Sequence, residues 1–371
     1  MKYYLLAGEA SGDLHGANLM KALKAEDPQA EFRFFGGDLM LAQGGVCDKH
    51  YSEMAFMGFI EVLANLRTIS KNLKLAKESV KSYQPDALIL IDFPGFNLKI
   101  AEFAKAQDIP VHFYISPKVW AWNQKRMLKI KKVVDHLYCI LPFEVDFYKS
   151  WGMEIDYVGN PLMDAIAAYT FDVNFRKNHH LDDRLILALL PGSRKMELKH
   201  ILPQMIAASD RFSSHQVVIA GAPNFKTEDY AAYIGERKVS VVFNATYDLL
   251  KNAEAALVTS GTATLETALL RCPQVVLYRG SKISVAIARL LVKIRFISLV
   301  NLIMDREVVK ELIQEDCHPD RIAMELQAII TNGPARKRML EDYQLLAEKV
   351  GPEGASGRTA KLIQKYLRKS K

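Results

Sequence analysis

The chain has 371 residues, of which half are hydrophobic and a quarter are charged. This composition excludes a disordered protein, and the length suits two domains of ordinary size, each with its own core. Lys and Arg outnumber Asp and Glu by 49 to 42. That surplus suits an anionic partner: a nucleotide, a phosphorylated substrate, nucleic acid or anionic lipid.

Targeting signals and cysteine motifs are not apparent. Tyr3–Ala7 gives only a short apolar run before Gly8 and Glu9, which does not predict a signal peptide. No uninterrupted apolar run is long enough to predict a membrane-spanning helix. The scattered cysteines form no CxxC pair, so neither a disulfide framework nor a zinc ribbon is indicated. We expect a cytosolic protein that can touch a membrane surface.

Short apolar runs alternate with longer segments of helical period, which predicts parallel strands joined by crossover helices. The expected strands of the first half are Tyr3–Ala7, Phe32–Phe35, Ala87–Ile91, Val111–Ile115, His136–Leu141 and Asp156–Val158. The expected helices between them include Leu14–Ala25, Glu61–Tyr83 and Leu98–Gln107.

The same pattern restarts after a polar segment over residues 170–184. The second set of expected strands is Leu185–Leu190, Gln216–Ala220, Val239–Phe243, Ala255–Val258 and Gln274–Leu277. The fold predicted is therefore α/β, with two Rossmann-like doubly wound domains and an interdomain cleft that binds ligands. The expected domains are residues 1–170 and 171–350, followed over 351–371 by a helix that can pack back on the N-terminal domain.

The first strand opens into Gly8-Glu9-Ala10-Ser11-Gly12-Asp13. Small residues after a strand let the backbone approach a ligand, and the next helix N-terminus favours anions. A tight turn with Asp13 as the helix N-cap explains Gly12 and Asp13 equally well. For Glu9, a carboxylate at the end of a strand, a functional role is favoured.

Asp92 directly follows the apolar strand Ala87–Ile91. A carboxylate at this place points toward the ligand edge of a parallel sheet, and partial burial would raise its proton affinity, as a general base requires. A turn aspartate held by backbone amides is an equal alternative.

A further strand runs into Ser116-Pro117-Lys118-Val119-Trp120-Ala121-Trp122, with more basic residues behind it. Such a segment suits a phosphate and a sugar face, or single-stranded nucleic acid. The competing interpretation is a core Trp120 followed by a solvated basic helix.

Two loops of the second half pair small residues with polar ones after a strand. The first is Pro191-Gly192-Ser193-Arg194, where a glycine turn, a hydroxyl and an arginine predict a pyrophosphate site. A capping box with Glu197 is its alternative. The second is Ser260-Gly261-Thr262, with Glu266 one turn into the next helix, where it could accept the ribose hydroxyls.

Two segments are more apolar than an ordinary surface. The first runs from Met54 to Ile69 and precedes Lys71, Lys74, Lys77 and Lys81; the second is Val285–Met304. Basic amphipathic segments of this kind lie in membrane interfaces, although core helices with snorkelling lysines are more common in general.

Taken together, these motifs resemble the lipid-A-disaccharide synthase family. In chain order they are GEASGD, MGFIEVL, IDFPGFN, SPKVWAWNQKR, LLPGSRKMEL, SGTATLE and NLIMDREVVKELIQEDC, from Tyr3 to about Cys317. Each motif alone is weak, whereas the whole set in this order is specific. The resemblance implies a GT-B glycosyltransferase.

The resemblance also implies the reaction. A 2,3-diacylglucosamine unit passes from UDP-2,3-diacylglucosamine to the 6-hydroxyl of 2,3-diacylglucosamine 1-phosphate, giving the β-1,6 disaccharide 1-phosphate of lipid A biosynthesis and UDP. An α-linked donor giving a β product means inversion in one displacement, with a base for the acceptor proton and positive groups for the diphosphate. No metal and no cofactor are expected.

The resemblance further implies the partners and the location of the protein. The protein is expected to act at the inner face of the inner membrane of a Gram-negative bacterium. It is not expected to bind nucleic acid, and the possibility of a homodimer is left open. Because both substrates carry acyl chains, membrane contact is favoured over a core role for Met54–Ile69.

Site residues follow from the matching motif positions. The catalytic candidates are Asp92, as the base, and Glu9. The diphosphate and UDP candidates are Gly192, Ser193, Arg194, Ser260, Gly261, Thr262 and Glu266, and the acceptor or cleft candidates are Ser11, Gly12, Trp120 and Asn301. The membrane-contact candidates are Phe56, Met57, Phe59, Ile60 and Leu63.

Two departures from the family pattern bear on these roles. Gly95 stands where members often have a second acid, which removes a rival base and favours Asp92. Val300 replaces the usual proline before Asn301, which weakens the assignment of Asn301. A UDP-N-acetylglucosamine 2-epimerase or another GT-B N-acetylglucosaminyltransferase leaves IDFPGFN and SPKVWAW unexplained. A basic module that binds RNA or a membrane leaves the paired nucleotide loops unexplained.

Overall fold

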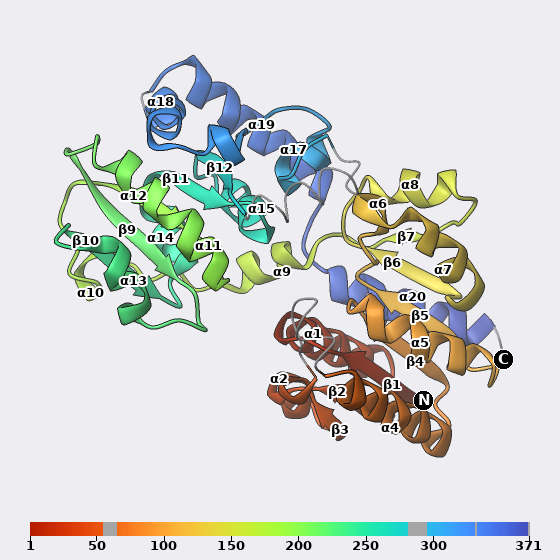
Figure 1. The fold of residues 1–371 in the computed structure, drawn as a ribbon. Helices are drawn as coiled ribbons and strands as arrows, with labels where there is room; N and C mark the ends of the chain where they lie inside the picture. Colours follow the sequence, from red (N-terminus) through yellow and green to blue (C-terminus); the bar gives the residue numbers. More distant parts are fainter. Residues whose placement is uncertain (55–64, 281–294, 331, 370–371) are drawn as a thin grey trace. The chain divides into compact units, whose positions relative to one another are not determined.

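The chain forms two compact units in the computed structural model, which describes residues 1–54, 65–280, 295–330 and 332–369 (Figure 1). Unit 1 comprises Met1–Asp164 and Pro352–Lys371, and unit 2 comprises Ala165–Gly351. The first unit thus ends at Asp164, before the expected boundary at residue 170, and the chain returns to it at Pro352.

Unit 1 is built on a parallel sheet in the order β3-β2-β1-β4-β5-β6-β7. Its strands are β1 Lys2–Ala7, β2 Glu31–Gly36, β3 Val46–His50, β4 Ala87–Ile91, β5 Val111–Tyr114, β6 His136–Cys139 and β7 Asp156–Tyr157. Its helices are α1 Ala10–Glu26, α2 Asp38–Ala42, α4 Leu66–Tyr83, α5 Pro94–Lys105, α6 Val119–Trp122, α7 Met127–Val133, α8 Glu144–Ser150 and α20 Ala355–Lys369. Helix α9, Pro161–Ala168, spans the boundary between the units.

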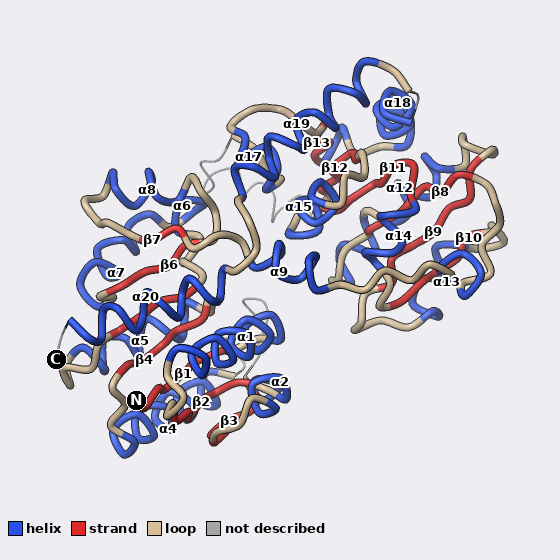
Figure 2. The backbone as a smooth tube through the Cα atoms, turned by 180° about the vertical axis from the view of Figure 1, so that it is seen from behind, coloured by secondary structure: helices blue, strands red, loops and turns tan. Residues whose placement is uncertain are grey.

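Helices cover both faces of this sheet. On one face α4, α5 and α7 contribute side chains such as Val80, Ile100 and Ile130 to a core with β4 and β5. On the other face α1 packs beside α20, whose Ile363 and Leu367 are buried in a second core (Figure 2). The C-terminal helix therefore belongs to unit 1.

Unit 2 repeats the design with a parallel sheet in the order β10-β9-β8-β11-β12-β13. Its strands are β8 Leu185–Leu190, β9 His215–Gly221, β10 Val239–Phe243, β11 Ala253–Thr259, β12 Gln274–Tyr278 and β13 Lys310–Ile313. Its helices are α10 Phe175–Asn178, α11 Lys195–His200, α12 Leu202–Ser209, α13 Thr227–Ile234, α14 Thr246–Asn252, α15 Thr262–Leu269, α17 Leu299–Met304, α18 Pro319–Ile330 and α19 Pro334–Val350. Residues of α10 and α14 form a core with β8 to β11.

The predicted α/β fold is confirmed, and all the strands expected from the sequence are present. The sequence did not predict β3 and β13, whose residues are mostly polar or half-buried. Helix α1 begins at Ala10, not at Leu14, and α5 begins at Pro94, not at Leu98.

Among the described residues, no helix has the length and apolar character needed to cross a bilayer. The membrane-contact candidates Phe56, Met57, Phe59, Ile60 and Leu63 lie outside the described residues, as does the first half of the second apolar segment, residues 285–294.

Candidate active site

The strand order of unit 1 reverses between β1 and β4, and Glu9 and Asp92 stand at this point. The two strands pair in parallel register, with Ala7 beside Ile91, so the residues that follow them meet at the same edge of the sheet. Open parallel sheets bind ligands at the carboxyl ends of their strands where the order reverses. Unit 1 therefore brings the two predicted catalytic carboxylates to one ligand edge.

Asp92 is held in an unusual backbone conformation with φ at +43°, followed by Phe93 at +48°. Its amide donates to the Tyr114 carbonyl at 3.1 Å, and its own carbonyl accepts from Asn97 Nδ2 at 2.8 Å. Non-glycine residues in the left-handed region are uncommon and concentrate at functional sites. The backbone of Asp92 is thus fixed by its neighbours at the end of the strand.

The surroundings of Asp92 favour its neutral form. Burial raises the pKa of its carboxyl group, while the charge of Lys118 and the Phe93 amide act in the opposite direction. A carboxylate with increased proton affinity is a better general base than an ordinary surface carboxylate.

The loop after β1 is closely packed. A side chain at Gly8 would lie 2.4 Å from the Phe93 ring, and one at Gly12 would lie 3.2 Å from Ala7 Cβ. Glu9 occupies the extended N-cap position of α1 and is half-buried, and Ser11 is exposed in the first turn. Glycine here serves close packing of the two strand-end loops.

Asp13 is not the N-cap of α1, which corrects that interpretation. It lies inside the helix, is 3% exposed, and accepts from the amides of Gly37, Leu39 and Met40 at 2.7 to 3.1 Å. It therefore satisfies the unpaired amides at the start of α2, across the loop, and has a structural role.

Trp120 belongs to a buried cluster that sequence reasoning missed. Glu144, 1% exposed, accepts from Ser116 Oγ at 2.6 Å, Trp120 Nε1 at 3.0 Å and the Leu141 amide at 3.1 Å. Burial raises the pKa of Glu144 to about 7. The indole N–H is thus already used within the protein, and Trp120, 9% exposed, fits the core interpretation better than a sugar platform.

The strand order of unit 2 reverses between β8 and β11, where Leu190 lies beside Val258. The loop Gly192–Arg194 follows β8, and the loop Ser260–Thr262 follows β11. The residues predicted to bind UDP therefore come together at the equivalent edge of the second sheet.

In the first of these loops the backbone amides are already occupied. Glu197 Oε2 accepts from the amides of Ser193 at 2.9 Å and Arg194 at 3.1 Å, which is the glutamate half of a capping box; the N-cap is Arg194, not Ser193, and its guanidinium cannot accept the reciprocal bond. Gly192 has φ of +95°, and a side chain there would lie 2.2 Å from Glu197 Oε2. The charged group available to an anion in this loop is the guanidinium of Arg194, 71% exposed and 3.4 Å from Glu197 Oε1, and the Ser193 side chain is exposed beside it in sequence.

The second loop is more open. Gly261 and Thr262 are exposed, and no atom comes within 4 Å of the position where a Gly261 side chain would begin. Ser260 Oγ donates to the Ile297 carbonyl at 2.9 Å, which fixes the loop.

Glu266 lies one turn into α15 and is half-buried. It accepts from Tyr247 Oη at 3.1 Å, and burial raises the pKa of its carboxyl group. An acceptor at this position suits neutral hydroxyl donors.

Asn301 is not available to a ligand, which corrects its assignment to the acceptor site. It is fully buried; its Oδ1 accepts from the amides of Val308 and Val309, and its Nδ2 donates to Glu311 Oε1 and the Val309 carbonyl. Its amide thus holds the segment before β13 against α17.

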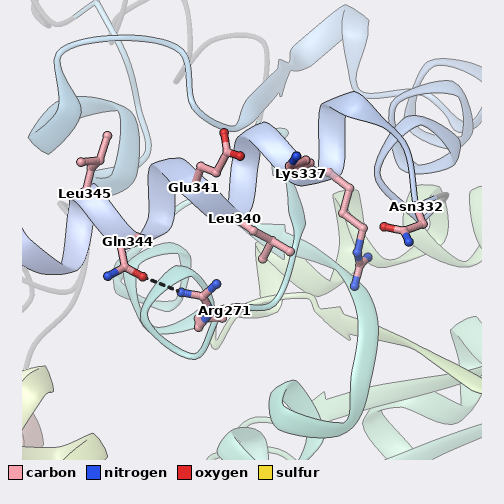
Figure 3. A pocket seen from close by; sticks show the side chains of 8 residues that line it. Arg271, Asn332, Lys337, Leu340, Glu341, Gln344 and Leu345 are labelled. Carbon is pink, nitrogen blue, oxygen red and sulfur yellow. Dashed lines mark hydrogen bonds between the residues drawn. The ribbon is translucent and has the colours of Figure 1, made fainter.

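A separate hollow of about 540 Å³ lies beside α19 in unit 2 (Figure 3). Arg271 in its wall donates to Gln344 Oε1 at 3.3 Å, and Lys337 and Glu341 stand on the helix above. Arg271 precedes β12, so this hollow is at the amino ends of the strands, away from the edge of Arg194 and Glu266.

Comparison with known proteins places the whole chain in one group. The family model described as lipid-A-disaccharide synthetase matches residues 3–364. A lipid-A-disaccharide synthase of Myxococcus xanthus is 38% identical over 98% of this chain and 97% of its own length. One of Syntrophus aciditrophicus is 39% identical over 99% of this chain and 98% of its own length.

Solved structures of low sequence identity share the fold. The Staphylococcus aureus MnaA–UDP structure superposes with a TM-score of 0.70 at 14% identity, covering 99% of this chain and 97% of that one. The calicheamicin glycosyltransferase CalG4 superposes with a TM-score of 0.62 at 14% identity, covering 100% of this chain and 98% of that one. These neighbours identify the two-domain architecture as that of GT-B glycosyltransferases and related epimerases.

Proposed function

The chain belongs to the lipid-A-disaccharide synthetase family, and from this premise we propose that Asp92 is its general base and that Arg194 and Glu266 bind the UDP part of its donor. The protein is a glycosyltransferase that makes the lipid A disaccharide, and its family implies a UDP-sugar and a lipid-linked sugar as substrates. The observation that carries the assignment of the base is the burial of Asp92 at the strand-order reversal of unit 1.

The proposed reaction is a single displacement with inversion. The acceptor 6-oxygen bonds to C1 of the donor sugar, its proton passes to the Asp92 carboxylate, and the bond from C1 to the diphosphate oxygen breaks as UDP departs. The raised pKa of Asp92 helps it to take the proton, and the positive charge of Arg194 stabilises the leaving diphosphate.

Replacing Asp92 by asparagine tests this role. Asp92→Asn keeps the size of the side chain but cannot take the proton, so turnover should fall by about 10²–10⁴-fold. Turnover is measured as UDP release together with lipid product from UDP-diacylglucosamine and diacylglucosamine 1-phosphate. UDP affinity and the melting temperature should stay as in the wild type, because the residue acts on the acceptor.

The pH profile provides a second measurement on the same protein. Because burial raises the pKa of Asp92, its carboxylate is lost on acidification at a higher pH than an ordinary aspartate would be. Turnover should therefore decline on the acid side from that higher pH. Near-normal turnover of a stable Asp92→Asn protein would rule out the base role, and Glu9 would be tested next.

We also propose that the apolar segment between Met54 and α4 meets an anionic bilayer at the inner face of the inner membrane, since both substrates carry acyl chains. Met54 itself is 4% exposed and belongs to the core of unit 1, so it is not part of this surface. Support comes from the described part of α4, where Leu66 is 53% and Leu75 37% exposed beside exposed lysines. Apolar side chains flanked by lysines bind anionic interfaces in a salt-dependent manner.

Vesicles of anionic lipid test the membrane proposal. The wild type should cosediment with them, less so as salt increases, and replacing Phe59, Ile60 and Leu63 together by serine should release it without lowering its melting temperature. Leu128→Ser is the matched control, because Leu128 is 69% exposed on α7. A triple variant that melts early or aggregates would show that these three residues are core residues.

A further inference from the structure

Helix α8 and the loop after β5 are tied together by one buried carboxylate. Glu144, the first residue of α8, binds the side chains of Ser116 and Trp120 through the same oxygen. Helices α6 and α8 lie side by side at this end of unit 1 (Figures 1 and 2). The loop is therefore fixed on both sides of the residue between them, Lys118.

Lys118 is exposed, and its loop follows β5, the strand next to β4, which the catalytic candidate Asp92 follows. The Asp92 amide donates to the Tyr114 carbonyl at 3.1 Å. Ile115, at the start of the loop, has φ of +65°, which is strained for a β-branched residue. The charge of Lys118 acts on both Asp92 and Glu144.

We propose that Lys118 is a further binding residue of this site, supplying the positive charge that receives the phosphate group of the acceptor, and that Glu144 is the positioning residue that holds its loop. This inference rests on the proposed function, in which the Asp92 edge takes the acceptor. The acceptor carries its reacting hydroxyl and its phosphate on the same sugar ring, so a cation beside the base is well placed to bind the phosphate.

The electrostatic surroundings support this role. Burial raises the pKa of Glu144 to about 7, so near neutral pH its carboxylate only partly offsets the charge of Lys118. The other titratable groups that face Glu144 are Cys139, Tyr148 and Tyr157, each with a pKa raised by burial and neutral at that pH. The exposed ammonium of Lys118 is therefore free of a strong counter-charge among the described residues and can bind a phosphate through a charge-assisted hydrogen bond.

The decisive variant is Lys118→Met, assayed with diacylglucosamine 1-phosphate and with diacylglucosamine that lacks the phosphate. The wild type should prefer the phosphorylated acceptor in kcat/KM by about tenfold or more, as expected for a charge-assisted contact. Lys118→Met should lose this preference through a higher KM, and Lys118→Arg should keep most of it. Donor KM should not change.

Lys125→Met is the matched control, because Lys125 is an exposed lysine of the same basic segment that is not among the groups acting on Asp92. It should keep the full phosphate preference. A Lys118→Met protein that discriminates as the wild type does would overturn the inference.

Glu144→Gln tests the positioning role. Glutamine can still accept from Ser116 and Trp120, but its NH₂ group faces the Leu141 amide where the carboxylate accepted a hydrogen bond. The phosphate preference should fall partway toward that of Lys118→Met, and the double variant should show no further loss. If Glu144→Gln does not fold, Ser116→Ala removes one of the same bonds and should also lower the preference.

The pH profile separates this inference from the proposed function. Lys118 lowers the pKa of Asp92, so Lys118→Met should move the acid limb of kcat/KM to higher pH. The acids that follow β1 and β2, Glu9, Asp13 and Asp38, are the same in both proteins. An active Asp92→Asn protein would refute the proposed base while leaving the phosphate preference measurable. An inactive Asp92→Asn protein combined with an unchanged preference and pH profile in Lys118→Met would refute only the role of Lys118.

Discussion

The ligand edges of the two sheets have the same topology but differ in how their polar side chains are surrounded. In unit 1, Asp92 is half-buried and Glu144 is buried, and burial raises the pKa of each carboxyl group. In unit 2, Glu266 is likewise half-buried with a raised pKa, but Arg194 is 71% exposed and the loop at Gly261 is open. Both edges thus hold a carboxylate of increased proton affinity, and the edge of unit 2 adds an exposed guanidinium and an open loop that can bind and release an anion.

The difference also extends to the backbone. Asp92, Phe93 and Ile115 take left-handed conformations at the ends of β4 and β5, where they cost conformational energy. At the strand-order reversal of unit 2 the residue with positive φ is Gly192, in the loop after β8, where the conformation costs little; Asn244 and Gln314 take left-handed conformations further out, after β10 and β13. The reversal point with strained non-glycine residues is the one assigned to chemistry, and the predictions below test whether the other only binds.

Among the variants of unit 2, the largest expected effect is on UDP affinity. Arg194→Ala removes the exposed guanidinium and should weaken UDP binding by an order of magnitude or more, because a charge-assisted contact contributes ~1.5–3 kcal/mol. Calorimetry measures the affinity, and Lys199→Ala, an exposed cation further along α11, is the control. The assignment of UDP binding to unit 2 and of proton transfer to unit 1 would be contradicted if Arg194→Ala left UDP affinity unchanged while Asp92→Asn lowered it.

A smaller effect, on thermal stability, should distinguish Gly192 from Gly261, the glycines of the two ligand-edge loops of unit 2. Gly192→Ala places a side chain at φ of +95° against Glu197 and should destabilise the unit by roughly 1–2 kcal/mol, which thermal unfolding detects as a lower midpoint. Gly261→Ala meets open space in an extended backbone, so its midpoint should not change.

UDP binding by Gly261→Ala then gives a second measurement. If the loop after β11 approaches the diphosphate, the added methyl group should weaken UDP binding in a protein of normal stability. Equal midpoints for the two glycine variants would contradict the close approach of Glu197 to Gly192.

The sequence predicted both sheets because their strands are apolar runs with regular spacing. Strands β3 and β13 escaped prediction because their polar residues carry no such signal, and pairing with a neighbouring strand determines their conformation. Asp92 and Glu266 were found by their place after a strand or in a family motif. Glu144 has the same kind of signal, an acid soon after β6, yet its importance depends on Ser116 and Trp120, which only the tertiary structure brings to it.

Capping and buried networks were the least predictable features. Asp13 accepts from backbone amides at the start of α2, a different helix from its own. The side-chain amide of Asn301 is fully hydrogen-bonded, in part by the backbone of the later segment at Val308. The sequence shows that such residues are polar, but not that their partners lie inside the fold.

The smallest expected effect concerns the ribose of UDP. It tests whether Glu266 of unit 2 accepts a hydrogen bond from a ribose hydroxyl. Glu266 is half-buried and already accepts from Tyr247, so one further hydroxyl contact should contribute about 1 kcal/mol, a few-fold in affinity. The wild type should therefore bind UDP a few-fold more tightly than 2′-deoxy-UDP or 3′-deoxy-UDP. Glu266→Gln should reduce this ratio, because a neutral amide oxygen is a weaker acceptor than a carboxylate.

The informative quantity is the ratio of the affinity for UDP to the affinity for either deoxynucleotide. All three nucleotides carry the same diphosphate, so their common contact with Arg194 cancels in this ratio. Acidification should also lower the ratio in the wild type, since burial raises the pKa of Glu266 and its carboxylate is protonated earlier than an ordinary glutamate. Tyr247→Phe is the matched control: it leaves the carboxylate in place and removes only its present donor, so discrimination should be kept or increased. A wild-type protein that binds the deoxynucleotides as tightly as UDP would remove Glu266 from the donor site and leave Arg194 as the residue of unit 2 that recognises the nucleotide.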